Sequence, residues 1–78
     1  MRFYVLVYDQ VRGRLLDMES FGSEGGQAAL ARRFELDREY AYAPTVEVVL
    51  LSAESPDALR RTHGRYFKSV DQLMKPAV

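Results

Sequence analysis

The sequence lacks cysteine and tryptophan, and it has a single histidine among its 78 residues. The absence of cysteine excludes disulfide bonds and thiolate-bound zinc, two devices that often stabilise chains of this size. The longest apolar run, from Phe3 to Tyr8, is far shorter than the about 20 residues that a membrane-spanning helix needs. Acidic and basic side chains balance at eleven each, which excludes a surface that is basic all over.

The composition that remains is typical of one small folded domain over residues 1–78. Hydrophobic residues make up 47% of the chain and aromatic residues 12%, more than disordered segments carry. No secretory signal pattern precedes the first apolar run, so we expect a soluble, cytoplasmic protein. A domain this small buries only about 60–65% of its unfolded surface, and self-association is the stabilising device that stays open to it.

Two extended runs near the N-terminus are separated by a short polar segment. The run Arg2–Tyr8 is rich in β-branched and aromatic residues, and Arg14–Phe21 largely alternates between apolar and polar positions. Asp9 and Gly13 between them are typical turn residues, Gly13 because it accepts a positive φ. The pattern predicts a β-hairpin.

A helix is predicted over Gln27–Tyr40. Leu30 and Phe34 are four residues apart, as are Leu36 and Tyr40, so we expect these side chains to form a wide apolar stripe toward the core. Charged residues fill the rest of the helix surface.

A third strand and a second helix follow. The run Thr45–Ala53 is apolar at nearly every position, which favours burial on both sides. Ser55 is a typical N-cap and Pro56 suits the first helical position. From there an amphipathic helix is expected to continue until Pro76, with Gly64 either inside it or marking a bend.

The element order β-β-α-β-α predicts an α+β fold, with a three-stranded mixed sheet and two helices in two layers. The crossover from the second to the third strand should be right-handed, which makes those two strands parallel. Placing the first strand between them gives the order 2-1-3, which we prefer because the most apolar strand then lies in the centre. The alternative order 1-2-3 would place Asp17 and Glu19 in the central strand.

The strands offer more apolar surface than two helices on one face can cover. If both helices cover one face, the other face exposes Tyr4, Leu6, Tyr8, Val49 and Leu51, or Val46, Val48 and Leu50 in place of the last two. Such a patch approaches the few hundred Å² above which exposed apolar surface usually marks a contact. We therefore predict a homodimer, with the face of Tyr4, Leu6 and Tyr8 at or near the contact.

Two other arrangements would also solve this problem. Helices on opposite faces of the sheet would make three layers and leave no patch uncovered. Alternatively, two copies could extend the sheet edge to edge, because a three-stranded sheet has two free edges. In the third strand, only Glu47 resembles a residue that protects such an edge.

The densest polar segment lies in the predicted second helix. Five basic residues and one acidic residue fall between positions 60 and 75. The residues that could bind phosphates or another anion are Arg60, Arg61, His63, Arg65 and Lys68. On a continuous helix the four cations fall near one face. The alternative interpretation is the solvated outer surface of an amphipathic helix.

His63 could act as an acid, a base or a pH sensor, but no orienting carboxylate or nucleophile is placed beside it by local spacing. One histidine without cysteine is also a poor start for a metal site. We therefore predict no catalytic residue, no metal and no cofactor. The favoured function is a small non-enzymatic, self-associating interaction or accessory module.

Two alternative functions stay open at this point. One is a nucleic-acid-binding module that uses the basic helix over residues 60–68. The other is a small ligand-binding protein or enzyme with a pocket around His63. A further protein partner fits any of these functions, and no membrane contact is predicted.

Overall fold

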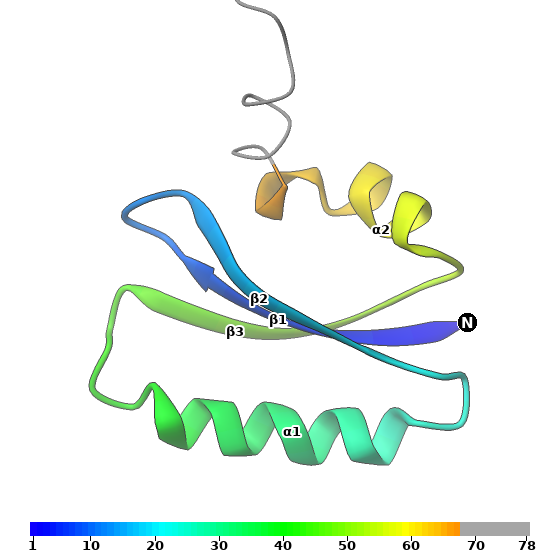
Figure 1. Ribbon diagram of the computed structural model, residues 1–78, viewed down its shortest axis with the longest axis horizontal. Coiled ribbons are helices and arrows are strands. Elements are labelled where there is room, and N and C mark those ends of the chain that lie inside the picture. Colours follow the sequence, from blue (N-terminus) through cyan, green and yellow to red (C-terminus); the bar gives the residue numbers. More distant parts are fainter. Residues whose placement is uncertain (68–78) are drawn as a thin grey trace, which may run out of the picture.

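The computed structural model describes residues 1–67, which form a three-stranded sheet and three helical segments (Figure 1). In chain order the elements are β1 (Arg2–Asp9), β2 (Arg14–Phe21), α1 (Gly26–Glu39), β3 (Val46–Ala53), α2 (Pro56–Thr62) and the 3-10 turn η1 (Gly64–Tyr66). The predicted order of strands and helices is confirmed. No helix within these residues is long and apolar enough to span a bilayer.

The sheet has the order β2-β1-β3, as predicted. β1 is antiparallel to both neighbours, so β2 and β3 run in the same direction without touching each other. The sheet is therefore antiparallel throughout and not mixed, because β1 separates the two strands that the crossover makes parallel. In the hairpin turn, Asp9 Oδ1 accepts hydrogen bonds from the N–H groups of Val11 and Arg12, and Gly13 adopts a φ of 61°.

The two helices lie on opposite faces of the sheet (Figure 1). On the α1 face the buried cluster consists of Val5, Val7, Ala29, Leu36 and Val48. On the α2 face it consists of Tyr4, Leu6, Tyr8, Ala53, Leu59, Tyr66 and Phe67. The expected two layers are thus wrong, and the three-layer alternative is the structure. The physical reason is that β1 is apolar on both faces, and one helix on each face removes both from water.

The face of α1 that packs on the sheet is narrower than the apolar stripe that the sequence predicted. Ala29 and Leu36 are buried, and Gly26 at the start of the helix lies so close to the Phe3 ring that an added Cβ would be 3.3 Å from Cζ. Leu30 and Phe34, expected in the core stripe, are instead 40% and 55% exposed. Small residues at the contact bring the helix close to the sheet, and this close approach leaves the two larger side chains on its flank.

α2 begins as expected and ends early. Ser55 Oγ accepts a hydrogen bond from the Ala58 N–H at 3.1 Å, and Pro56 occupies the first helical turn. The helix ends at Thr62 and the chain bends before η1, so Gly64 marks a bend and does not lie inside a continuous helix. The remainder of the predicted helix, from residue 68 onward, lies outside the described residues.

Candidate interaction surfaces

The face that we predicted as the dimer contact is covered within the chain. Tyr4 and Leu6 have no exposed surface and Tyr8 is 9% exposed, because α2 and the segment after it pack over them. Val49 and Leu51 pack against the same cluster and are half-buried. A face-to-face contact through Tyr4, Leu6 and Tyr8 is therefore wrong.

The predicted anion-binding residues do not share one helix face. Arg60 and Arg61 occupy the last turn of α2, where positive charge favours the negative end of the helix. α2 ends one residue before His63, which is half-buried, and Arg65 lies in η1. Lys68 lies outside the described residues. The prediction of one basic face depended on a continuous helix, which the structure does not contain.

Two of these cations are engaged within the chain. The guanidinium Cζ of Arg60 lies 5.6 Å from the centroid of the Phe67 ring. Arg65 Nη2 lies 3.2 Å from Glu47 Oε1, and its Cζ lies 4.7 Å from the centroid of the Tyr66 ring. A cation held over an aromatic face and against a carboxylate is less available to an external phosphate. Nucleic-acid binding by this segment stays a prediction.

Glu47 is the centre of a polar cluster at one end of the α2 face. Its Oε1 accepts hydrogen bonds from Gln10 Nε2 at 3.3 Å and from Arg65, and its Oε2 accepts one from Tyr66 Oη at 3.4 Å. The Tyr66 ring meets the Tyr8 ring edge to face, with centroids 5.1 Å apart. Burial raises the pKa of Tyr66, and the negative charge of Glu47 raises it further.

This cluster closes the end of the core on the α2 face. Its polar groups bond to one another, and within residues 1–67 no three potential metal-ligating side chains come together. The sequence indicated Glu47 only as a residue of the type that protects a strand edge. The one signal in the sequence that singled out Glu47 was that it is the only charged residue in the third strand. Its partner Arg65 could be identified only from the structure, where the chain bends after α2.

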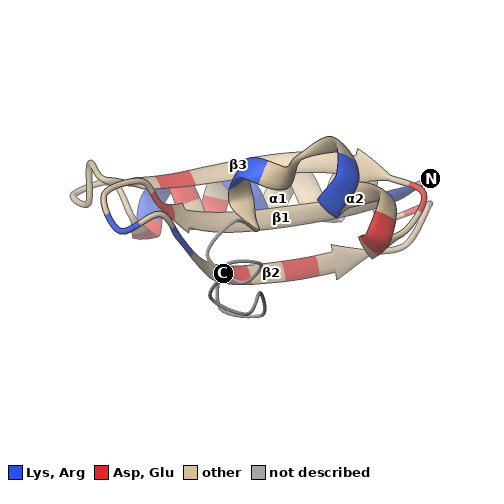
Figure 2. Cartoon of the chain, turned by 90° about the horizontal axis from the view of Figure 1, so that it is seen from above, with Lys and Arg blue, Asp and Glu red and all other residues tan. Residues whose placement is uncertain are grey.

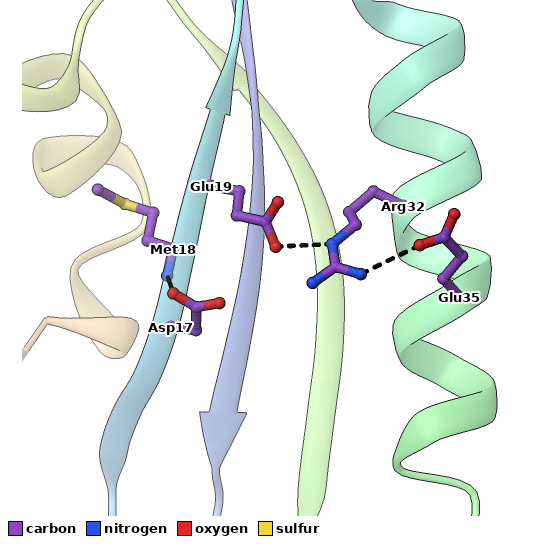
Figure 3. Close-up of polar contacts among 5 residues, drawn as sticks. All are labelled: Asp17, Met18, Glu19, Arg32 and Glu35. Atoms are coloured by element: carbon purple, nitrogen blue, oxygen red, sulfur yellow. Dashed lines mark hydrogen bonds and ion pairs between the residues drawn. The ribbon is translucent and has the colours of Figure 1, made fainter.

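The outer edge of β2 is protected by its own side chains. Met18 lies opposite Leu6 in β1, at a position where Met18 directs its N–H away from the sheet. The Asp17 Oδ1 atom accepts this N–H at 2.9 Å (Figure 3). A β-bulge also interrupts the register between Val7 and Tyr8. Charged side chains and bulges are the usual means by which an edge strand is kept from pairing with another chain.

Within residues 1–67, the outer edge of β3 lacks comparable protection beyond its first residue. The Gln10 N–H donates to the Thr45 carbonyl at 2.8 Å, and this bond sets the alternation along the β1–β3 ladder. Alternate residues therefore direct their N–H and C=O groups away from β1, namely Val46, Val48, Leu50 and Ser52. The Val46 N–H donates to the Ala43 carbonyl at 2.9 Å, which leaves the N–H groups of the other three residues facing outward. No side chain of the described residues bonds to these groups, and β3 contains no bulge, proline or lysine.

Comparison with known proteins identifies no relative of this chain. No protein-family model, no curated protein and no solved structure matches the chain. The functional argument therefore depends on the contrast between the two edges of the sheet. Figure 2 shows this contrast from the α2 side, with acidic positions along β2 and only one near the start of β3.

Proposed function

We propose that this protein is a small non-enzymatic interaction module that self-associates by pairing β3 of one copy with β3 of another. The observation that supports the proposal is the difference between the two edges. In β2, Asp17 occupies the outward Met18 N–H and a bulge interrupts the strand, whereas the outward N–H and C=O groups of Val48, Leu50 and Ser52 in β3 bond to no group within residues 1–67. Such a row is a template for an added strand.

The side chains of β3 also suit a second copy. Seven of its eight residues are uncharged. Most are half-buried, so part of the surface of each side chain is covered within the chain and part stays accessible. Glu47 is the only charge, and it already pairs with Arg65 of its own chain. Two β3 strands can therefore meet without placing unpaired like charges opposite each other, which would weaken the contact.

The test is the oligomeric state of the full chain, measured by light scattering and sedimentation between about 1 µM and 1 mM, the range where weak to moderate dimers form. The informative variant is Ser52→Pro. Ser52 is exposed and directs its N–H outward, so proline removes an edge donor without removing a bond to β1. Ser20→Pro is the matched control, because Ser20 is exposed and directs its N–H outward from β2.

We expect the wild-type chain and Ser20→Pro to dimerise, and Ser52→Pro to stay monomeric with an unchanged circular dichroism spectrum. If proline unfolds either chain, Ser52→Lys and Ser20→Lys repeat the comparison with an edge charge. A wild-type chain of 8.9 kDa at every concentration would overturn the proposal. Equal effects at both edges would overturn it as well.

A parallel measurement separates this function from nucleic-acid binding. A single-stranded oligonucleotide is titrated against the wild-type chain and against the variant Arg60→Ala/Arg61→Ala/Arg65→Ala. Self-association through β3 predicts no salt-dependent shift for either protein. A shift that weakens with salt and disappears in the triple variant would favour the basic segment instead.

A further inference from the structure

The exposed pair Leu30 and Phe34 lies on the flank of α1 next to β3. Arg32 marks the opposite flank, because its Nε donates to Glu19 Oε2 of β2 at 2.8 Å while its Nη1 contacts Glu35 at 3.1 Å (Figure 3). These bonds raise the pKa of Arg32, so its charge persists. Leu30 and Phe34 are each two residues from Arg32, about 160° around the helix. They therefore face away from β2, above the open edge of β3.

The positions of the two side chains along the strand can be worked out from the backbone. Gly26 contacts Phe3, which pairs with Ser52 in β3, so α1 starts at the level of Ser52 and runs antiparallel to β3. A helix advances about 1.5 Å per residue and a strand about 3.3 Å. Leu30 then lies at about the level of Leu50, and Phe34 at about the level of Val48. Val49 is level with the midpoint of the pair.

We propose that α1 of a second copy covers Leu30 and Phe34 when the two β3 strands pair. This inference rests on the proposed function and names the partner and the register of that same edge. The β3 strands run antiparallel about a two-fold axis at Val49, so Val48 pairs with Leu50 of the second copy. Leu30 then contacts Phe34 of the second copy, and the reverse contact follows from the symmetry.

The spacing of the layers permits this contact. α1 packs most on β3 and β1 and less on β2, so its axis lies between β1 and β3. An axis midway between these two strands is about 2.4 Å from β3, and with paired β3 strands about 4.8 Å apart the two α1 axes are then about 10 Å apart, at the upper end of the range for packed helices. The contact strip is as long as β3, about 26 Å, and covers the sheet and the α1 layer, each about 10 Å thick. It therefore buries on the order of 500 Å² per copy, about the 1,000 Å² in total that a specific interface needs.

The first test removes the side chains from the proposed helix contact. Leu30→Ala/Phe34→Ala keeps strong helix formers in α1, and we expect the dimer Kd to rise about 100-fold because the apolar contact is lost from both copies. The matched control is Leu16→Ala/Met18→Ala, which removes the exposed apolar pair of β2, 45% and 37% exposed. This control should leave the Kd within about threefold of wild type.

The second test measures the register of the paired β3 strands directly. Because the chain has no cysteine of its own, any disulfide must form through the introduced one. A cysteine at a strand position on the two-fold axis meets its own copy within disulfide distance. Val49→Cys should therefore form a covalent dimer under mild oxidation, whereas Val48→Cys and Leu50→Cys should not.

The outcomes separate the two proposals. A monomeric wild-type chain overturns both of them. A dimer that dissociates in Ser52→Pro but keeps its Kd in Leu30→Ala/Phe34→Ala supports β3 pairing and overturns the α1 contact. Crosslinking through Val48→Cys or Leu50→Cys, without crosslinking through Val49→Cys, also overturns the proposed register. A weakened helix variant together with a crosslinked Val49→Cys dimer supports the inference.

Discussion

The carboxylate of Asp17 accepts the backbone N–H of Met18 at 2.9 Å, on the side of β2 that faces away from β1. A side chain thus occupies a donor that a neighbouring strand would otherwise use (Figure 3). In β3 the Ala43 carbonyl accepts the Val46 N–H at 2.9 Å, but no group within residues 1–67 occupies the outward N–H groups of Val48, Leu50 and Ser52. The two edges of one sheet therefore differ in their capacity to accept another strand.

Replacing Asp17 should open the second edge. In Asp17→Ala the Met18 N–H loses its partner and one negative charge leaves the edge, so both edges of the sheet can pair. We expect species larger than a dimer to appear with rising concentration in sedimentation velocity. Glu35→Ala, which removes an exposed carboxylate from α1, should behave as the wild-type chain. A purely dimeric Asp17→Ala would show that this carboxylate does not protect β2.

Shortening Leu59 should be far more costly than shortening Leu30. Leu59 has no exposed surface and lies in the cluster under α2, whereas Leu30 is 40% exposed. We expect Leu59→Ala to lower the free energy of unfolding by about 2–5 kcal/mol, through lost burial and a residual cavity. Leu30→Ala should lower it by less than about 1 kcal/mol. Urea unfolding of the monomeric Ser52→Pro background removes the contribution of association. Similar losses of unfolding free energy at both positions would contradict the packing of α2 on the sheet.

Removing the Glu47 carboxylate should loosen the end of the core that it closes. Glu47→Ala leaves the Tyr66 hydroxyl and the Arg65 guanidinium without their acceptor. Hydrogen bonds to charged groups are worth about 1.5–3 kcal/mol when partly buried, so a loss of about 1–3 kcal/mol is expected in urea unfolding. Glu24→Ala, which removes an exposed carboxylate before α1, is the control. Equal stability of the two variants would mean that the cluster contributes nothing measurable.

The raised pKa of Tyr66 predicts a loss of stability at alkaline pH. Burial first, and then the charge of Glu47, favour the protonated phenol in the folded chain, whereas the unfolded chain titrates at the ordinary value near 10. The folded state therefore keeps its full stability below about pH 10 and loses this contribution as the pH rises through the higher folded pKa. Thermal unfolding from pH 8 to 12 measures the effect.

Tyr66→Phe supplies the comparison for that titration. It should flatten the fall in the unfolding midpoint above pH 10 and remove one tyrosinate step above pH 10 from the absorbance titration of the folded chain. An identical alkaline profile in the variant would assign the effect to another group.

Local patterns were sufficient for the elements and for their order in the sheet. The hairpin depends on Asp9 and Gly13, and the N-terminus of α2 depends on Ser55 and Pro56, and all four act over a few residues as their types predict. The position of β1 in the centre follows from its apolarity on both faces. These features depend on backbone geometry and burial, which neighbouring residues alone can indicate.

The placement of the candidate surfaces was less predictable. Periodicity placed Leu30 and Phe34 in the core, but the close contact of Gly26 and Ala29 with the sheet turned α1 so that they remain exposed. The prediction that the basic residues share one helix face required a helix that continues past Gly64. The chain instead bends there and brings Arg65 to Glu47. Both errors arose because side-chain packing between different elements decided which residues are exposed and where Arg65 lies. A local sequence pattern does not indicate such packing.

By itself, the sequence determined that the chain forms a hairpin, a crossover helix and a third strand with an apolar strand in the centre, since these depend on local turn chemistry and on period-two hydrophobicity. Only the tertiary structure decided which face each helix covers. One helix per face buries both sides of β1, and the surplus apolar surface moves from the face of Tyr4 and Leu6 to the edge of β3 and the flank of α1. Burial is a property of the whole assembly of elements, and for that reason the candidate contact surface became visible only after the layers were in place.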